Sequence, residues 1–321
     1  MFLSFDDTVN LINGGKQLHI AGSEGILRKL PKGEWIGGST EYFMTEGGGK
    51  ISDDRLFVTE LQYEKLRVAS YGARNIANIA SDAYDNGFSI VIIPFDSDVH
   101  KEYAQNAAGY KDMFLKNIIG WISGVNLGKS GQTPIAVNGR TGEVFSDKAV
   151  VMHCQVPENK TVSLNIVNIF SQDESSPLIE FKEEGFSVKN CFINGKETPF
   201  ADYIAKNGIN TQLPLVGDYS GSGVNISFKL IENGVVNFYA PVFSGIKYRI
   251  AKSIPDYADA FRRRLSGISD KNAAFSCNCI LNFLYGELEG KNIKEFGGPI
   301  TFGEIAYQLL NQTLVYVDIT E

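Results

Sequence analysis

The side chains of this sequence best suited to nucleophilic or metal chemistry are the two thiols of the tripeptide Cys277-Asn278-Cys279. Two thiols one residue apart in a strand point to the same side of the sheet, because side chains alternate along a strand. A structural zinc site draws on four clustered ligands, and the chain has only three histidines. The pattern favours buried structural thiols, and a cysteine nucleophile that recruits His19 or His153 through the fold stays open.

Glu304 is the second candidate for chemistry. It follows Gly303 in a glycine-rich stretch and precedes an apolar strand expected from Thr313 to Ile319. A carboxylate there could act as a general base in a glycine-lined pocket, or it could accept hydrogen bonds from backbone N–H groups at a turn. The sequence contains no G-x-S-x-G elbow and no H-E-x-x-H or E-x-x-H pair. Without a motif for a nucleophile, the turn interpretation is preferred.

The segment 34–44, EWIGGSTEYFM, combines glycines, hydroxyl groups and aromatic rings. Glycines let a ligand approach the backbone, hydroxyl groups donate and accept hydrogen bonds, and aromatic rings supply apolar walls. That composition suits a pocket for a small polar molecule, but a tight strand bend with ordinary packing, the commoner origin of such glycines, explains it as well. The candidate ligand-binding residues are Trp35, Gly37, Gly38, Ser39, Thr40 and Tyr42, together with Cys277, Gly303 and Glu304.

Three other motifs are interpreted as structural. The segment 123–131, SGVNLGKSG, ends like a phosphate-binding loop, but Ser123 stands where the first glycine is required and a strand is expected to follow instead of a helix. The aspartates at 53–54 and 96–98 lack the length of a calcium loop and fit turn positions. The basic run 262–264 fits the solvated face of a helix, with an acidic partner as the alternative. No metal or cofactor is expected.

Composition indicates a globular protein that neither spans a membrane nor binds nucleic acid. The 321 residues are 43% hydrophobic and 21% charged, and the formal net charge of −7 repels phosphate backbones. The longest apolar run, 88–95, has the length of a buried strand. The start of the chain lacks the positive region of a secretion signal, and the four cysteines have no framework spacing. These features predict a cytoplasmic protein with reduced thiols.

Apolar periodicity predicts a mixture of helices and strands. Two stretches, starting at Gly48 and Gly139, share glycine, a charged residue, a β-branched residue, Ser-Asp and an apolar strand, which suggests an internal repeat. Asp6 or Asp7 is the expected cap of the first helix. Expected helices lie within 6–15, 71–86, the start of 111–124, 199–208 and 255–267, and expected strands within 16–22, 54–63, 88–95, 213–242, 272–283 and 313–319.

The best boundary is the segment 170–186, which is polar, acidic and broken by Pro177. The expected fold class is α+β, with two related, pseudo-symmetric lobes of mixed β-sheet and helices packed over them. The expected division is 1–64 as an N-terminal elaboration packed on the first lobe, 65–169 as the first lobe, 170–186 as the linker and 187–321 as the second lobe.

The C-terminal region resembles the FIST family. It runs NGKETPFADYI, a glycine-broken hairpin, NAAFSCNCILNF, GGPITFGEIA and NQTLVYV. This is similar to the family's strand ending near a cysteine, its Gly-Phe-x-x-x-Gly-Glu and its Asn-x-Thr before a final strand. Cys277, residues 299–304 and residues 311–313 occupy those places, whereas CNCILN replaces the arginine and glycine that follow the family's cysteine. Residues 65–169 resemble the N-terminal FIST domain more loosely, and the first 64 residues look like an elaboration of a stand-alone subgroup.

The resemblance implies a non-catalytic sensory protein in intracellular signalling, which binds a small molecule such as an amino acid or amine and acts through a separate output protein. Two alternatives stay open. One is a hydrolase or transferase that uses Cys277 or Glu304 in a cleft between the lobes, and the other is a structural or assembly module without a ligand. A pocket shared by Trp35 to Tyr42 and the turn at Glu304 would favour a cationic ligand, because a partly buried carboxylate needs a partner.

Overall fold

The computed structural model describes residues 1–268, 273–293 and 296–321. The described residues form four six-stranded sheets and one three-stranded sheet, with a few short helices between and over them. The expected α+β class with mixed sheets is confirmed. The strand orders do not show the expected pseudo-symmetry between two lobes.

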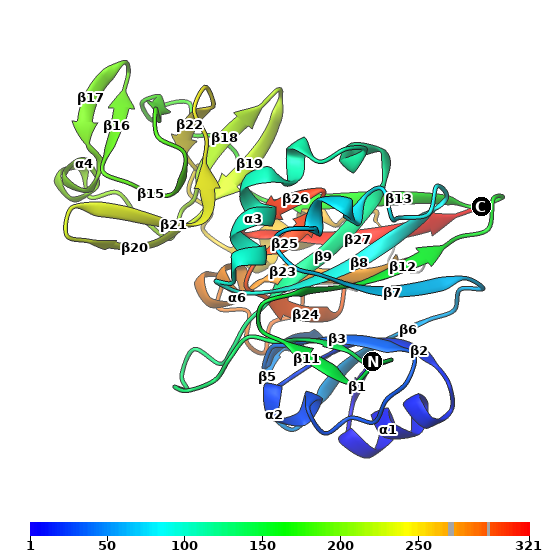
Figure 1. The fold of residues 1–321 in the computed structure, drawn as a ribbon. Coiled ribbons are helices and arrows are strands. Elements are labelled where there is room, and N and C mark those ends of the chain that lie inside the picture. Colours follow the sequence, from blue (N-terminus) through cyan, green and yellow to red (C-terminus); the bar gives the residue numbers. More distant parts are fainter. Residues whose placement is uncertain (269–272, 294–295) are drawn as a thin grey trace.

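The N-terminal sheet lies at the bottom of Figure 1 and is covered by α1 (Phe5–Asn13) and α2 (Glu24–Leu27). Ser4, and not the expected Asp6 or Asp7, caps α1, because its side chain accepts a hydrogen bond of 3.1 Å from the N–H of Asp7. A separate core that includes Leu18, Ile20 and Trp35 fills this layer. The strands, in sheet order, are β1 (Phe2–Leu3), β6 (Leu56–Leu61), β2 (Gln17–Gly22), β3 (Trp35–Ser39), β10 (Ala136–Asn138) and β11 (Glu143–Phe145).

Two six-stranded sheets pack face to face in the centre of the molecule and enclose a large part of the main core, which continues into residues 171–250. The first carries α3 (Asp98–Asn106) and consists of β26 (Gln308–Leu310), β25 (Glu304–Ala306), β9 (Asn117–Ser123), β8 (Gly87–Pro94), β12 (Ala149–Gln155) and β7 (Leu66–Tyr71). The second consists of β13 (Thr161–Asn168), β27 (Thr313–Thr320), β23 (Ala273–Cys279), β24 (Gly298–Thr301), β4 (Tyr42–Thr45) and β5 (Gly48–Ile51).

Three expected elements of the central part differ from the structure. The helix expected within 71–86 is wrong: only a 3-10 turn, Ile76–Ile79, forms there. The side chain of Asn75 accepts a hydrogen bond from the N–H of Gly72, a local bond that competes with helical pairing. Within 111–124 the helical start is a single 3-10 turn, and strand β9, which pairs with β8, follows it.

The strand expected within 272–283 is half correct. Residue 272 lies outside the described residues, β23 covers Ala273–Cys279, and the apolar run that follows is helix α6 (Ile280–Tyr285). Ile280, Leu281 and Phe283 of α6 are buried, so a helix places this run in the core as well as a strand would.

Residues 171–250 form a module at the upper left of Figure 1. The chain then returns through α5 (Tyr257–Arg264) to the central sheets, so residues 187–321 contribute to two parts of the molecule. Helix α4 (Phe200–Asn207) belongs to the module, which contains a six-stranded and a three-stranded sheet. The six-stranded sheet consists of β17 (Lys196–Pro199), β16 (Asn190–Ile193), β14 (Ile179–Glu180), β22 (Lys247–Ile250), β18 (Leu215–Tyr219) and β19 (Ser222–Ile226). The three-stranded sheet consists of β15 (Gly185–Val188), β21 (Val235–Val242) and β20 (Phe228–Glu232).

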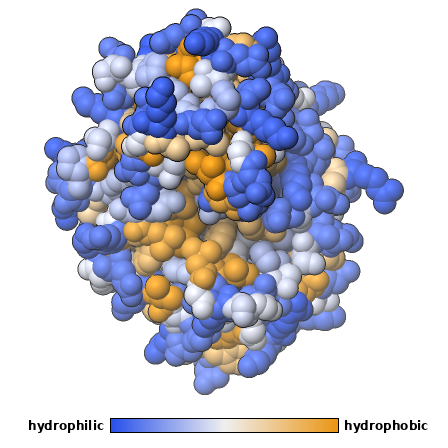
Figure 2. Space-filling view, turned by 90° about the vertical axis from the view of Figure 1, so that its left-hand side faces the viewer, coloured by the Kyte–Doolittle hydropathy of each residue, from blue (hydrophilic) through white to orange (hydrophobic). Residues whose placement is uncertain are grey.

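Figure 2 shows the face that lies at the left of Figure 1, and apolar side chains gather in a hollow near its middle. Elements on this side carry exposed leucines, including Leu230 of β20 and Leu284 of α6. None of the helices in the described ranges has the length and apolar character that crossing a bilayer requires.

Candidate functional site

Glu304 lies in the closed core between the two central sheets. Its side chain is fully buried, and its carboxyl group accepts hydrogen bonds from the backbone N–H of Thr313 at 3.1 Å, the Thr313 hydroxyl at 2.8 Å and the Thr301 hydroxyl at 3.3 Å. Burial raises the pKa of Glu304 to about 8, so the side chain is protonated at neutral pH. This geometry supports the interpretation of Glu304 as a residue that accepts hydrogen bonds from the backbone.

The two thiols of the C-x-C tripeptide are buried, as expected, and neither forms a disulfide. Cys277 donates a hydrogen bond of 3.4 Å to the carbonyl of Gly120. Burial raises the pKa of both Cys277 and Cys279 well above the usual value, so neither is a thiolate at neutral pH. Among the hydrogen bonds of the described residues, none joins His19 to either thiol; its Nε2 accepts a hydrogen bond of 2.9 Å from the Trp121 indole.

The other histidine, His153, belongs to a buried hydrogen-bonded chain that the sequence did not indicate. Ser89 Oγ lies 2.8 Å from His153 Nδ1, the Tyr71 hydroxyl lies 3.1 Å from Nε2, and the same hydroxyl donates to Asp82 at 2.8 Å. Ser89 and His153 are arranged like a serine nucleophile and its histidine base. Ser89 and His153 are fully buried, however, and none of the cavities found in the described ranges reaches Ser89. The chain of groups is therefore structural.

The glycines and the tryptophan of segment 34–44 serve packing. Trp35 is 1% exposed and donates a hydrogen bond of 2.8 Å to the carbonyl of Pro31. A Cβ on Gly38 would lie 2.7 Å from the ring of Trp121, and a Cβ on Gly37 would lie 2.9 Å from a strand carbonyl. Gly38 is required where the N-terminal sheet approaches a central sheet, and Gly37 is required where β3 packs within the N-terminal layer.

The three hydroxyl groups of the same segment bind backbone groups. Ser39 joins both ends of the loop 124–135, since its Oγ donates to one carbonyl at 2.7 Å and accepts from one N–H at 2.9 Å. Thr40 donates to a carbonyl of β24 at 2.7 Å, and the Tyr42 hydroxyl accepts from the N–H of Leu127 at 3.0 Å. The segment thus fixes the loop 124–135 in place.

The structure does not bring the candidate residues into one cavity. Trp35 belongs to the N-terminal core, whereas Glu304 lies among residues of the main core. Trp121 separates them, because it packs against Gly38 and stands opposite Glu304 in the strand pair β9–β25. No cavity found in the described ranges is lined by both. The assignment of Trp35, Gly37, Gly38, Ser39, Thr40, Tyr42, Cys277, Gly303 and Glu304 as ligand residues stays a prediction.

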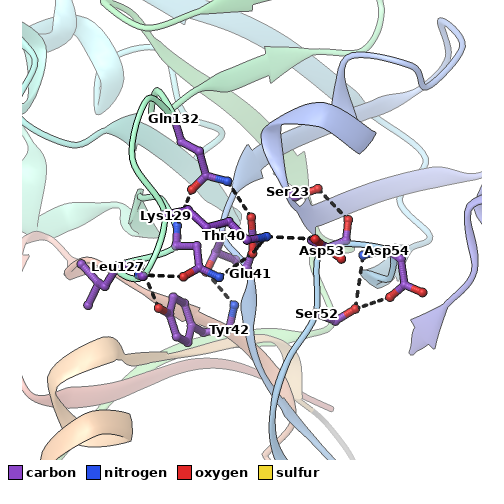
Figure 3. A network of polar contacts seen from close by, with 12 residues as sticks. Ser23, Thr40, Glu41, Tyr42, Ser52, Asp53, Asp54, Leu127, Lys129 and Gln132 are labelled. Atoms are coloured by element: carbon purple, nitrogen blue, oxygen red, sulfur yellow. Dashed lines mark hydrogen bonds and ion pairs between the residues drawn. The ribbon is translucent and has the colours of Figure 1, made fainter.

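Glu41, in the link from β3 to β4, is the charged residue that this region buries. It is 2% exposed, and its carboxylate accepts hydrogen bonds from Lys129 at 2.8 Å, Asn126 at 2.6 Å and Gln132 at 2.7 Å (Figure 3). Burial by itself raises the pKa of Glu41, but these three hydrogen bonds outweigh burial and hold the pKa below its usual value. Glu41 is therefore an ionised carboxylate in a nearly dry position.

A cavity of about 680 Å³ opens beside Glu41. Lys129 reaches across it from the loop 124–135 and also binds Asp53 at 2.9 Å. Phe5 and Ile26 supply apolar wall, Asp53 and Asp54 are the acidic groups at the rim, and Lys29 is a second lysine in the lining besides Lys129. The cavity therefore combines a buried anion, an exposed acidic rim and an apolar side, which is the composition of a site for a small organic cation.

Two segments that the sequence singled out separately meet at this cavity. Segment 34–44 contributes Glu41, and the segment that ends like a phosphate-binding loop contributes Lys129. Sequence reasoning missed both residues. Glu41 is the one carboxylate within 35–45, but the sequence does not show that this run is buried or that Lys129 reaches it.

Two other cavities have no buried charge. The larger, of about 950 Å³, lies between β1, β6, β5 and β23. Of its two acidic residues, Glu46 is exposed and Glu60 is paired with Lys16 at the surface. The smaller, of about 410 Å³, lies beside the exposed Arg263 and Arg264 of α5. The Glu41 cavity is thus the best candidate site.

Fold and site define an α+β protein with a charged cavity at the junction of its N-terminal and central sheets. The chain belongs to a family of unknown function, DUF6976, whose sequence model matches residues 3–320. No curated protein and no solved structure matches the chain.

Proposed function

We propose that this chain is a non-catalytic sensory protein that binds a small amine or other organic cation at Glu41. One observation carries the proposal: a 2% exposed, ionised carboxylate lines a cavity, and the cation bound to it is a lysine whose side chain is 42% exposed. A buried carboxylate requires a cation or several hydrogen bonds. Lys129 occupies the place that the ammonium group of a ligand would take.

Exchange of Lys129 for a ligand is energetically reasonable. Lys129 is bound on an exposed loop, so its side chain regains water and rotamer freedom when it leaves Glu41. An amine with an apolar body keeps the ion pair with Glu41 and also buries apolar surface against Phe5 and Ile26. Asn126 and Gln132 continue to bind the carboxylate and orient it.

The same exchange would provide a signal. Ser39 anchors both ends of the loop 124–135. Between them the loop is held by Asn126, Lys129 and Gln132, which bind Glu41, and by the bond of Leu127 to Tyr42. Leu127 is 54% exposed, so a shift of the loop would change an apolar surface that an output protein could contact. We therefore extend the FIST resemblance to function and propose that this family is a divergent, cytoplasmic relative with a separate output partner.

Titration with amino acids, monoamines and polyamines, followed by thermal unfolding and calorimetry, tests the proposal. An amine ligand should raise the unfolding temperature in proportion to the logarithm of its concentration, and Glu41→Gln should weaken binding by about tenfold or more. Glu60→Gln, the same change in the 950 Å³ cavity, is the matched control and should bind as the wild type does.

Lys129→Met sharpens the test. If Lys129 holds the place of the ligand, this variant should bind amines more tightly, because no internal cation competes for Glu41. If Lys129 instead binds a ligand carboxylate, the variant should bind more weakly. The proposal is wrong if no amine stabilises the wild type or Lys129→Met.

A further inference from the structure

Strand β13 ends one of the two central six-stranded sheets. It pairs with β27 along its whole length, from Thr161 opposite Thr320 to Asn168 opposite Thr313. Within the described residues, no strand pairs with the other side of β13. The outward backbone groups of an eight-residue strand are thus left as a template for a further strand.

The sequence of β13, TVSLNIVN, has none of the features that prevent edge-to-edge pairing. It contains no charged residue and no proline. Ile166 is 45% exposed, although it lies in the middle of the strand. Lysine, proline and inward-pointing charges are the usual protection of an edge strand, and short length is another. β13 is long, uncharged and open.

The other edges in the described parts of the chain are protected. β17 carries a lysine, a glutamate and a proline, β20 carries a lysine and a glutamate, and β7 carries an arginine. β1, β5, β11, β15 and β26 have two to four residues. β19 has five residues, of which the last three are buried against the rest of the protein. The contrast shows that an open edge is particular to β13.

We propose that β13 pairs antiparallel with β13 of a second copy of this chain. The pairing joins the second central sheet of one copy to the same sheet of the other across a twofold axis. A twofold interface places the same strand opposite itself, so it requires a strand without like charges, and β13 meets this requirement. The nearest charge, Lys160, precedes the strand, and antiparallel pairing keeps its two copies at opposite ends of the interface.

The interface is expected to be weak and reversible. Backbone bonds along one eight-residue edge bury less surface than the roughly 1,200 Å² at which stable interfaces begin. The exposed Ile166 of each copy adds apolar contact across the new strand pair. Dimer and monomer should therefore exchange over the micromolar range of protein concentration.

Sedimentation velocity over a concentration series, with hydrogen exchange of the β13 amides, tests this pairing. The wild type should show a concentration-dependent dimer in which the outward amides of β13 become protected. Ile166→Lys should raise the dimer Kd by about tenfold or more, because it places a charge on the edge that a second strand would have to cover. Ser163→Lys, a second exposed change in β13, should act in the same direction if Ile166→Lys disturbs the fold.

Leu230→Lys is the matched control, since Leu230 is 40% exposed on β20, an edge strand that already carries charge. It should dimerise as the wild type does. A wild type that stays monomeric at every concentration overturns the proposal and leaves the edge to an extended segment of another protein. A dimer that both β13 variants preserve also overturns it. Neither result bears on amine binding at Glu41.

Discussion

Glu41 and Glu304 are both buried glutamates, but their surroundings favour the ionised form of Glu41 and the protonated form of Glu304. Glu41 is 2% exposed and its pKa lies below the usual value, whereas Glu304 is fully buried and its pKa is raised to about 8. The donors differ: Glu41 receives hydrogen bonds from an ammonium and two side-chain amides, while Glu304 receives them from hydroxyl groups and one backbone N–H.

The difference separates a structural carboxyl group from one that can recognise a charge. Glu304 has no cationic partner among the described residues, and no cavity found there reaches it. Burial therefore favours its protonated form. Glu41 keeps its charge because a cation and amides supply what water would supply, and its cation can be exchanged through the adjacent cavity. Burial alone therefore does not identify a functional carboxylate.

The largest expected effect is on the pH dependence of stability. The folded protein holds the Glu304 proton up to about pH 8, whereas the unfolded chain releases it near pH 4.5. The contribution of Glu304 is therefore fully present below pH 4.5 and is lost as pH rises to about 8. Relative to the wild type, Glu304→Gln should gain about 1.4 kcal/mol in unfolding free energy per pH unit across this window. Urea unfolding from pH 5 to pH 9 measures it.

Glu41→Gln provides the opposite sign in the same experiment. The pKa of Glu41 is lowered in the folded state, so its contribution is present above the unfolded pKa of 4.5 and is lost as pH falls through the folded pKa. Glu41→Gln should therefore be least stable relative to the wild type at neutral pH and approach it in acid. Parallel pH profiles for the two variants would contradict the assignment of opposite charge states.

Much of the fold could be predicted from the sequence, because its periodicity is strong where one face of an element is buried. The apolar run 88–95 and the final stretch from Thr313 form strands, and residues 199–208 and 255–267 contain helices α4 and α5. The failures lie where composition is ambiguous. Apolar residues at helical spacing within 71–86 are interrupted by asparagine and serine, which bond to their own backbone.

The site could be predicted only in part. The glycines and hydroxyl groups of EWIGGSTEYFM indicate a site, but in the structure they serve packing and backbone bonds, and the charged residue of the segment, Glu41, lines the cavity. Glu41 and Lys129 are 88 positions apart, and local patterns carry no signal for such a pair. The route of the chain between two sheets brings them together, and sequence periodicity does not encode that route.

The next effect concerns stability at neutral pH. Glu41→Gln should destabilise the protein by about 1–3 kcal/mol, because it removes a charged acceptor and leaves Gln132 and Asn126 facing an amide whose geometry fits only one of them. Glu304→Gln should cost less at pH 6, since it replaces a neutral carboxyl group with a neutral amide of the same shape. Denaturant midpoints at pH 6 and pH 7 compare the two, and an equal or larger loss for Glu304→Gln would argue against a protonated Glu304.

The smallest effect distinguishes the rim of the cavity from its buried wall. Asp53 shares Lys129 with Glu41, but its side chain is 64% exposed, and water replaces most of what the ion pair supplies. Asp53→Asn should leave the unfolding midpoint unchanged within error.

The same variant should weaken amine binding by about two- to threefold, and added salt should reduce that difference, because exposed charges are screened. Binding by Glu41→Gln should remain weaker than the wild type in the same salt, because the loss arises at a carboxylate that is 2% exposed and is screened less than the rim. Calorimetric titration of both variants at low and high salt makes the comparison. If Asp53→Asn loses as much affinity as Glu41→Gln, or if salt removes both losses equally, the amine contacts the rim and the buried carboxylate does not select it.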